Sequence, residues 1–166
     1  MAYPRPKSKV IVMIYFANPA LQLESYNAEI RLAIDRVLNE RNFVLGNEVK
    51  ALEAEFCEYI GCQHAIGVAN GTDALELALR ALEIGAGDEV ITVSHTAVAT
   101  VAAIEATGAK ARFVDIDSDF FTLDPLKLSS SLSQKTKAVI AVHLYGHPAP
   151  ITEIALFCKK NNLKLI

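Results

Sequence analysis

The sequence is poor in cysteine, in basic clusters and in long apolar runs. Its 166 residues include 3 cysteines, too few and odd in number for a disulfide scaffold, which fits a reducing compartment. The net charge is −3, and without a Lys/Arg cluster this argues against a nucleic-acid partner. No uninterrupted apolar run approaches the ~18 residues that a membrane helix needs. We therefore expect a cytoplasmic protein with no nucleic-acid or membrane partner.

Hydrophobic residues make up 52% of the chain and charged residues 21%, which predicts a folded protein of about one domain. Arg5, Lys7 and Lys9 precede the apolar residues 10–17, which resembles the start of a secretory signal. Residues 18–21 do not form a small-x-small cleavage site, so an extended arm or buried strand is the favoured interpretation. We expect residues 1–14 to be a tail or arm and residues 15–166 to be the folded part.

Helical and strand-like patterns alternate along the chain. The spacing of apolar residues predicts helices, with apolar stripes and caps, over 28–41, 47–60, 74–84, 97–107 and 150–161. Asp124 and Pro125 predict the start of a further short helix. Near-continuous apolar runs predict strands over 64–69, 89–93, 110–115, 137–144 and 163–166. This order is typical of an α/β fold, a mostly parallel sheet with helices on both faces.

The turn at residues 70–73 is the most informative candidate for binding. In a parallel sheet, ligands gather beyond the carboxyl ends of the strands, and this turn follows the predicted strand 64–69. Gly71 permits close approach of a ligand, while the amides of Thr72 and Asp73 and the Thr72 hydroxyl suit a phosphate at a helix N-terminus. The same residues are common in an ordinary helix cap, which the tetrapeptide alone favours. Neither G-x-G-x-x-G after a strand nor G-x-x-x-x-G-K-[ST] occurs.

Other polar residues follow the remaining predicted strands. His95 lies after the strand 89–93, with a capping or loop role as its simpler interpretation. Asp115 and Asp117 follow the next strand, where acidic residues usually form turns. His143 and Tyr145 end the strand 137–144 and are candidates for facing a ligand, although a strand histidine is often a core residue.

The cysteines do not predict a metal site. Cys57 lies on a predicted helix and Cys62 just past its end, close to His64, but no fourth ligand is near in sequence. Packing is the favoured interpretation, and Cys158 is expected in the core.

Several segments together resemble one family. Residues 43–49, 65–75, 87–91, 94–100 and 143–146 are similar, in order and spacing, to the DegT/DnrJ/EryC1/StrS aminotransferases. These are pyridoxal-phosphate enzymes that aminate nucleotide-linked keto-sugars, used in amino-sugar and polysaccharide biosynthesis. The resemblance runs from about Tyr15 to the last residue.

The resemblance implies an incomplete large domain of a fold-type I aminotransferase. Gly71, Thr72 and Asp73 would hold the phosphate of pyridoxal 5'-phosphate, and residues 94–100 would lie against its ring. Many relatives have an aromatic side chain at the position of Ala97, stacked on the cofactor ring. Here either the imidazole of His95 stacks on that ring instead, or the stacking is weaker. The complete enzymes resemble homodimers with sites at the subunit interface, and they take a nucleotide sugar and an amino-acid amino donor.

The chain ends within the predicted strand 163–166, which suggests a truncated protein. The resemblance implies that the Asp that pairs with the pyridine nitrogen and the Schiff-base Lys both follow Ile166. No lysine here stands in the family's nucleophile context, the lysines being residues 7, 9, 50, 110, 127, 135, 137, 159, 160 and 164. We therefore expect no catalytic residue in the chain and no transamination by it alone.

Two alternatives stay open. One is a non-catalytic pseudoenzyme that keeps the phosphate turn and binds phosphate or cofactor without turnover. The other is a fragment of a PLP- or PMP-dependent sugar dehydratase of the same fold, in which histidine replaces the Schiff-base lysine. That histidine would also lie beyond Ile166.

Overall fold

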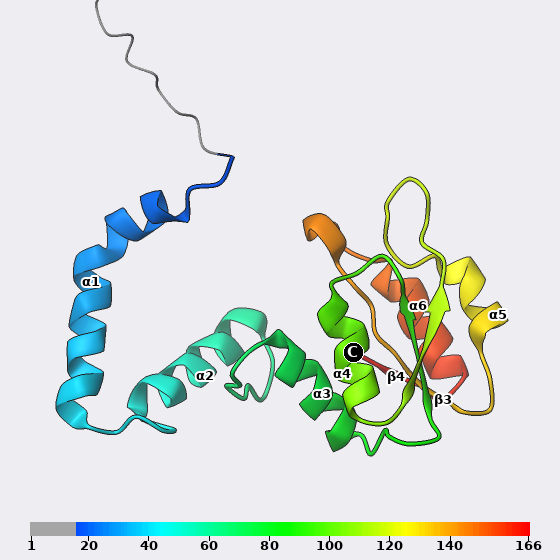
Figure 1. The fold of residues 1–166 in the computed structure, drawn as a ribbon, viewed down its shortest axis with the longest axis horizontal. Helices are drawn as coiled ribbons and strands as arrows, with labels where there is room; N and C mark the ends of the chain where they lie inside the picture. The colour runs from blue at the N-terminus through cyan, green and yellow to red at the C-terminus, as the bar shows by residue number, and fades with distance from the viewer. Residues whose placement is uncertain (1–15) are drawn as a thin grey trace, which may run out of the picture. The chain divides into compact units, whose positions relative to one another are not determined.

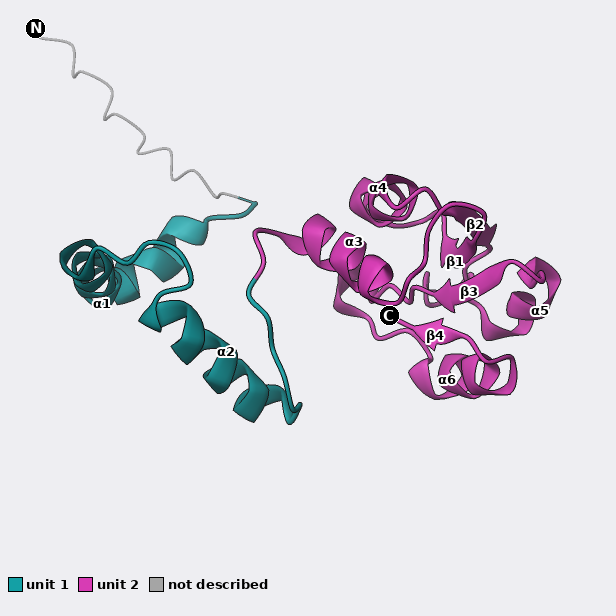
Figure 2. Ribbon diagram, turned by 90° about the horizontal axis from the view of Figure 1, so that it is seen from below, with its two compact units in different colours: residues 1–67 teal, residues 68–166 magenta. Residues whose placement is uncertain are grey.

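The computed structural model describes residues 16–166, in two compact units. Unit 1 comprises residues 1–67 and unit 2 residues 68–166, coloured teal and magenta in Figure 2. The predicted tail, residues 1–14, lies outside the described residues, as does most of the apolar arm. The assignment of residues 15–166 to one aminotransferase domain stays a prediction.

Unit 1 contains two helices, α1 (Pro19–Glu40) and α2 (Asn47–Ile60), which follow each other in Figure 1. The prediction that the first helix starts at residue 28 was wrong, because α1 already begins at Pro19. Proline suits the first helical turn, where its missing N–H would have no partner in any case. The side chain of Asn47 makes it a candidate N-cap from the sequence, but Asn47 is the first residue of α2 and Gly46 precedes it as N-cap. The predicted end at Gly61 is confirmed, with a φ of 76°.

The predicted strand over 64–69 is absent from the structure, which gives this segment irregular backbone. Its hydrogen bonds run to side chains: the Gly67 N–H donates to Glu53 Oε1 at 2.8 Å, and the His64 carbonyl accepts from the Cys62 thiol at 3.4 Å. Ile66 is 82% exposed. An apolar run becomes a strand only where a neighbouring strand pairs with it, and here the segment lies along α2 instead.

Unit 2 is built on a parallel four-stranded sheet in the order β2-β1-β3-β4. The strands are β1 (Glu89–Val93), β2 (Lys110–Val114), β3 (Thr136–Val139) and β4 (Lys164–Leu165). The predicted parallel sheet is confirmed. The last two strands are shorter than predicted, since β3 ends at Val139 rather than at residue 144.

Helices cover both faces of this sheet, as predicted. Figure 2 shows α3 (Gly71–Ala81) and α4 (Val98–Ala106) on one side of the strands. On the other side lie α5 (Leu128–Ser131) and α6 (Ile151–Lys160). Two short 3-10 turns complete the unit, η1 (Pro125–Lys127) and η2 (Leu144–Gly146). Asp124 caps η1 through a 3.0 Å bond from the Leu126 amide, as the sequence predicts.

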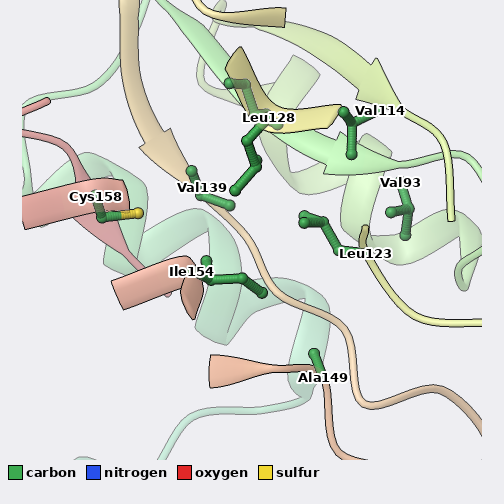
Figure 3. Close-up of a cluster of buried hydrophobic side chains, with 9 residues drawn as sticks. Val93, Val114, Leu123, Leu128, Val139, Ala149, Ile154 and Cys158 are labelled. Carbon is green, nitrogen blue, oxygen red and sulfur yellow. The ribbon is translucent and has the colours of Figure 1, made fainter. Parts of the chain in front are cut away.

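Alternate residues of the central strands enter two separate cores. Ile91 and Val139 pack with Leu128 and Ile154 in one core, shown in Figure 3. Their neighbours Val90 and Ala138 pack on the opposite face with Leu79 and Ile104. Burial on both faces explains why the strands read as continuous apolar runs. Among residues 16–166, no helix combines the length and the apolarity needed to cross a bilayer.

Candidate functional site

The connections of the sheet define where a ligand would bind. From β1 the chain crosses through α4 to β2, whereas from β3 it crosses through α6 to β4 on the other side. The carboxyl ends of β1 and β3 are therefore adjacent, with connections that leave in opposite directions. This is the topological switch point of a parallel sheet, where the loops part and leave a crevice.

The N-terminus of α3 lies at the same edge of the sheet. The Arg80 guanidinium in the last turn of α3 donates to the carbonyl of Ala106, the last residue of α4, at 2.8 Å. The two helices pack against each other with their C-terminal ends together, so their N-termini point toward the same edge. Because α4 starts directly after β1, that edge is the carboxyl edge. Residues 70–73 therefore lie at the carboxyl edge of the sheet, as expected, although no strand precedes them; their contact with a phosphate stays a prediction.

Asn70 organises this helix start. Its side-chain oxygen accepts the Asp73 N–H at 2.9 Å, and its side-chain nitrogen donates to Asp73 Oδ2 at 3.0 Å. The predicted cap is confirmed, whereas residues 71–73 form the first turn of α3 rather than a turn that precedes it. The Asp73 amide therefore already has a hydrogen-bond partner. In this conformation it is not free to make the contact with a phosphate that the sequence predicts.

Gly71 and Thr72 differ from Asp73 in this respect. Within the described part of the chain, their N–H groups and the Thr72 hydroxyl make no hydrogen bond to another protein group. A Cβ placed on Gly71 would meet no heavy atom within 4 Å, so the space in front of it is open. Two free amides at the positive end of an 11-residue helix, beside a hydroxyl, form a donor set that suits a phosphate.

His95 and Tyr145 meet at the switch point from opposite loops. His95 follows β1 and Tyr145 lies in η2 after β3, and the Tyr145 hydroxyl is 3.2 Å from His95 Nε2. Their rings are 5.7 Å apart with an edge-on angle of 65°. Phe121, from the loop after β2, lies 6.3 Å from the His95 ring. Sequence reasoning placed His95 and Tyr145 at strand ends but missed Phe121, which no motif marks.

The loop after β3 holds its side chains in a fixed arrangement. His143 Nδ1 accepts the Ala149 N–H at 3.0 Å, so the proton of the neutral ring is on Nε2. Tyr145 has a φ of 57°, a left-handed conformation that costs a non-glycine residue about 1–2 kcal/mol. The same left-handed conformation occurs in Phe121, the other aromatic residue beside His95, and also at helix ends such as Arg41.

The remaining candidates have structural roles. Asp117 accepts the amides of Asp119 and Phe120 at 2.8 and 3.0 Å, so it forms a turn as expected. Asp115 lies 3.8 Å from the Lys127 ammonium on the surface. Cys158 is buried in the core, where desolvation raises its pKa. No cluster of three or more metal-ligating side chains occurs among residues 16–166.

Comparison with known proteins shows which family this chain is similar to. The model of the DegT/DnrJ/EryC1/StrS aminotransferase family matches residues 24–166. A dTDP-3-amino-3,6-dideoxy-alpha-D-galactopyranose transaminase of Aneurinibacillus thermoaerophilus is 45% identical over 141 residues, covering 85% of this chain and 39% of that protein. The chain thus spans about two fifths of the length of such relatives.

Solved structures agree with the sequence matches. DesV of S. venezuelae, crystallised with a ketimine intermediate, superposes with a TM-score of 0.90 at 42% identity, over 92% of this chain and 41% of that one. NtdA of Bacillus subtilis, with bound cofactor PMP, has a TM-score of 0.84 at 28% identity, over 96% of this chain and 37% of that one. The fold is accordingly that of part of a fold-type I aminotransferase. This chain belongs to the DegT/DnrJ/EryC1/StrS aminotransferase family, whose members depend on pyridoxal phosphate.

Proposed function

We propose that this chain is the N-terminal portion of a pyridoxal-phosphate-dependent aminotransferase that acts on a nucleotide-linked keto-sugar, in amino-sugar or polysaccharide biosynthesis in the cytoplasm. The observation that carries the proposal is the start of α3, which presents two free amides at the carboxyl edge of a parallel sheet. Family membership and the nucleotide-sugar transaminase among the relatives support the same function.

The residues present fit the phosphate of the cofactor. The amides of Gly71 and Thr72 and the Thr72 hydroxyl would donate to phosphate oxygens, and the missing side chain of Gly71 leaves space for them. Asp73 would contribute by holding Asn70 in place rather than by its own amide, which Asn70 already occupies. Helix geometry and the macrodipole favour the anion at this end.

The switch point would receive the ring of the cofactor. Ala97 offers only a methyl group, and it lies exposed at the start of α4. His95 is the flat side chain nearest in sequence, and the Tyr145 hydroxyl holds its Nε2 at 3.2 Å. We therefore assign the ring contact to His95, with Tyr145 fixing the imidazole plane. When bound, pyridoxal phosphate supplies an electron sink for reactions at the amino-bearing carbon.

The chain's lysines support an incomplete site. A Schiff-base lysine reacts as a neutral amine, which requires desolvation or a nearby positive charge. Eight lysines lie within residues 16–166, and every one of them is exposed. Transamination would accordingly need the parts of the family's chains that lie outside the matched two fifths.

The test is an amide-resolved titration of the purified chain with inorganic phosphate and with pyridoxal phosphate, followed by borohydride reduction and mass spectrometry. The Gly71 and Thr72 amide signals should shift with both ligands, and pyridoxal without its phosphate should leave them unchanged. Gly71→Ala should weaken phosphate binding about tenfold, because its Cβ fills the open space. Absence of these shifts would contradict the phosphate site, and a stoichiometric adduct on a single lysine would contradict the incomplete catalytic site.

A further inference from the structure

Two of the cysteines meet at one helix end in unit 1. Cys57 lies in the last turn of α2, and Cys62 follows Gly61, whose φ of 76° reverses the chain. The amides of Gly61 and Cys62 both donate to the Cys57 carbonyl, at 2.9 and 3.1 Å. The bond from Cys62 closes a six-residue turn of the Schellman type.

This turn brings the two side chains together. With standard bond lengths, a 3.1 Å bond from the Cys62 amide to the Cys57 carbonyl limits the Cα separation to below ~7 Å. Disulfides span Cα separations of about 4.4–6.8 Å. The Cys62 thiol donates a hydrogen bond to the His64 carbonyl at 3.4 Å, within the same turn. Both cysteines are free thiols in the structure.

We propose that Cys57 and Cys62 form a reversible redox pair, which closes to an intramolecular disulfide by exchange with a low-molecular-weight disulfide such as oxidised glutathione. The pair is a modification site separate from the proposed cofactor site. Its reduced state is the expected one in a reducing compartment, and exchange with the disulfide closes it when the compartment becomes more oxidising.

The two thiols have different tasks in this exchange. Cys62 is exposed and attacks first, so its thiolate forms a mixed disulfide and releases one glutathione thiolate. Cys57 is half-buried, and desolvation together with the neighbouring Cys62 and Glu53 raises its pKa. After losing its proton, Cys57 attacks Cys62 Sγ and releases the second glutathione. Two protein thiols are thereby oxidised, and one glutathione disulfide is reduced to two thiols.

Closure would fix the chain that leaves α2. The segment after Cys62 is otherwise held along α2 by the bond from Gly67 to Glu53. A disulfide would fix the start of this segment, while the bond from Gly67 to Glu53 holds its other end. On oxidation, the backbone amides of residues 62–67 should therefore exchange with solvent more slowly.

The test is incubation of the reduced, native chain with oxidised glutathione, followed by thiol titration and peptide mapping. Titratable thiols should fall from 3 to 1, with the two lost thiols linked as Cys57–Cys62 and the intact mass lowered by two hydrogens. Cys57→Ser should stop at a stable Cys62–glutathione adduct, and Cys62→Ser should stay reduced. The matched control, Cys158→Ala, should still form the internal link.

A second measurement does not depend on oxidation. A trivalent arsenical, which bridges two adjacent thiols, should bind the native chain with one-to-one stoichiometry and should lose that binding in Cys57→Ser, with helical content checked by circular dichroism. A stable bis-glutathionylated chain, a link that involves Cys158, or a disulfide between two chains in place of the internal one would overturn the proposal.

Discussion

Asn70 shows how a single side chain sets up the candidate site. Its oxygen takes the Asp73 amide and its nitrogen holds the Asp73 carboxylate, so both groups are fixed at the start of α3. The amides of Gly71 and Thr72 are left facing outward, because a cap of this kind satisfies only one of the orphan donors of a helix. The cap therefore leaves two amides for the proposed anion site.

Removing the cap should destabilise unit 2. For Asn70→Ala we expect a loss of about 1 kcal/mol in the free energy of unfolding, because the Asp73 amide loses its acceptor. Asn70→Ser should retain most of this stability, because serine also accepts a backbone N–H at an N-cap. Chemical denaturation followed by circular dichroism measures the effect. Asn47→Ala is the control, since Asn47 lies exposed in α2 and caps nothing; an equal loss in both variants would refute the capping role.

Cys158 makes a residue-scale contribution to the pH dependence of stability. Burial raises its pKa above the ordinary value of 9.0, so the unfolded thiol ionises first as pH rises. Stability from this group is present below pH 9 and is lost as pH rises through the folded pKa. Denaturation midpoints measured from neutral pH to about pH 10 should fall more steeply in the wild type than in Cys158→Ala. Parallel curves would exclude this contribution.

At the scale of elements, α6 places one face in the core and the other in solvent. Ile154 is fully buried between α6 and the sheet (Figure 3), whereas Leu156 on the same helix is 64% exposed. Helical periodicity in the sequence predicts this separation, since the two side chains point about 200° apart around the helix.

Truncation on the buried face should be far more costly than on the exposed face. We expect Ile154→Ala to lower the free energy of unfolding by about 2–5 kcal/mol, from lost transfer energy and an incompletely filled cavity. Leu156→Ala should change it by less than about 0.5 kcal/mol. Paired denaturation curves in urea test this, and similar costs for the two variants would mean that α6 does not pack as the structure has it.

At the scale of the molecule, unit 1 leaves apolar side chains on one face of α1 in contact with solvent, among them Leu23, Ile34 and Leu38, each more than half exposed. Such a helix normally covers its apolar residues with another chain or segment. We propose that a second copy of this chain is the partner that covers these side chains.

The purified chain should therefore self-associate. Sedimentation equilibrium should give a mass of twice 18.0 kDa at micromolar concentration. Ile34→Glu should shift the chain toward monomer, because a carboxylate would be desolvated in the apolar contact. Ser25→Glu, which adds the same charge at an exposed polar position of α1, should leave the dimer intact. A monomer at every concentration measured would exclude the second copy as partner.

The sequence by itself determined the alternation of helices and strands, the parallel sheet and the cap at Asn70. These follow from local periodicity and from side chains that bond within a few residues. Only the tertiary structure decided that residues 64–69 form no strand and that β3 ends at Val139, since pairing depends on distant partners.

The residues of the candidate site likewise fall into those that local sequence predicts and those that only the tertiary structure brings together. Gly71 and Thr72 could be predicted from a short motif, because a helix start is a local structure. The meeting of His95, Phe121 and Tyr145 could not, because it depends on the order in which β1, β2 and β3 pair. Strand order is set by non-local burial on both faces of the sheet, and no single segment of the chain encodes it.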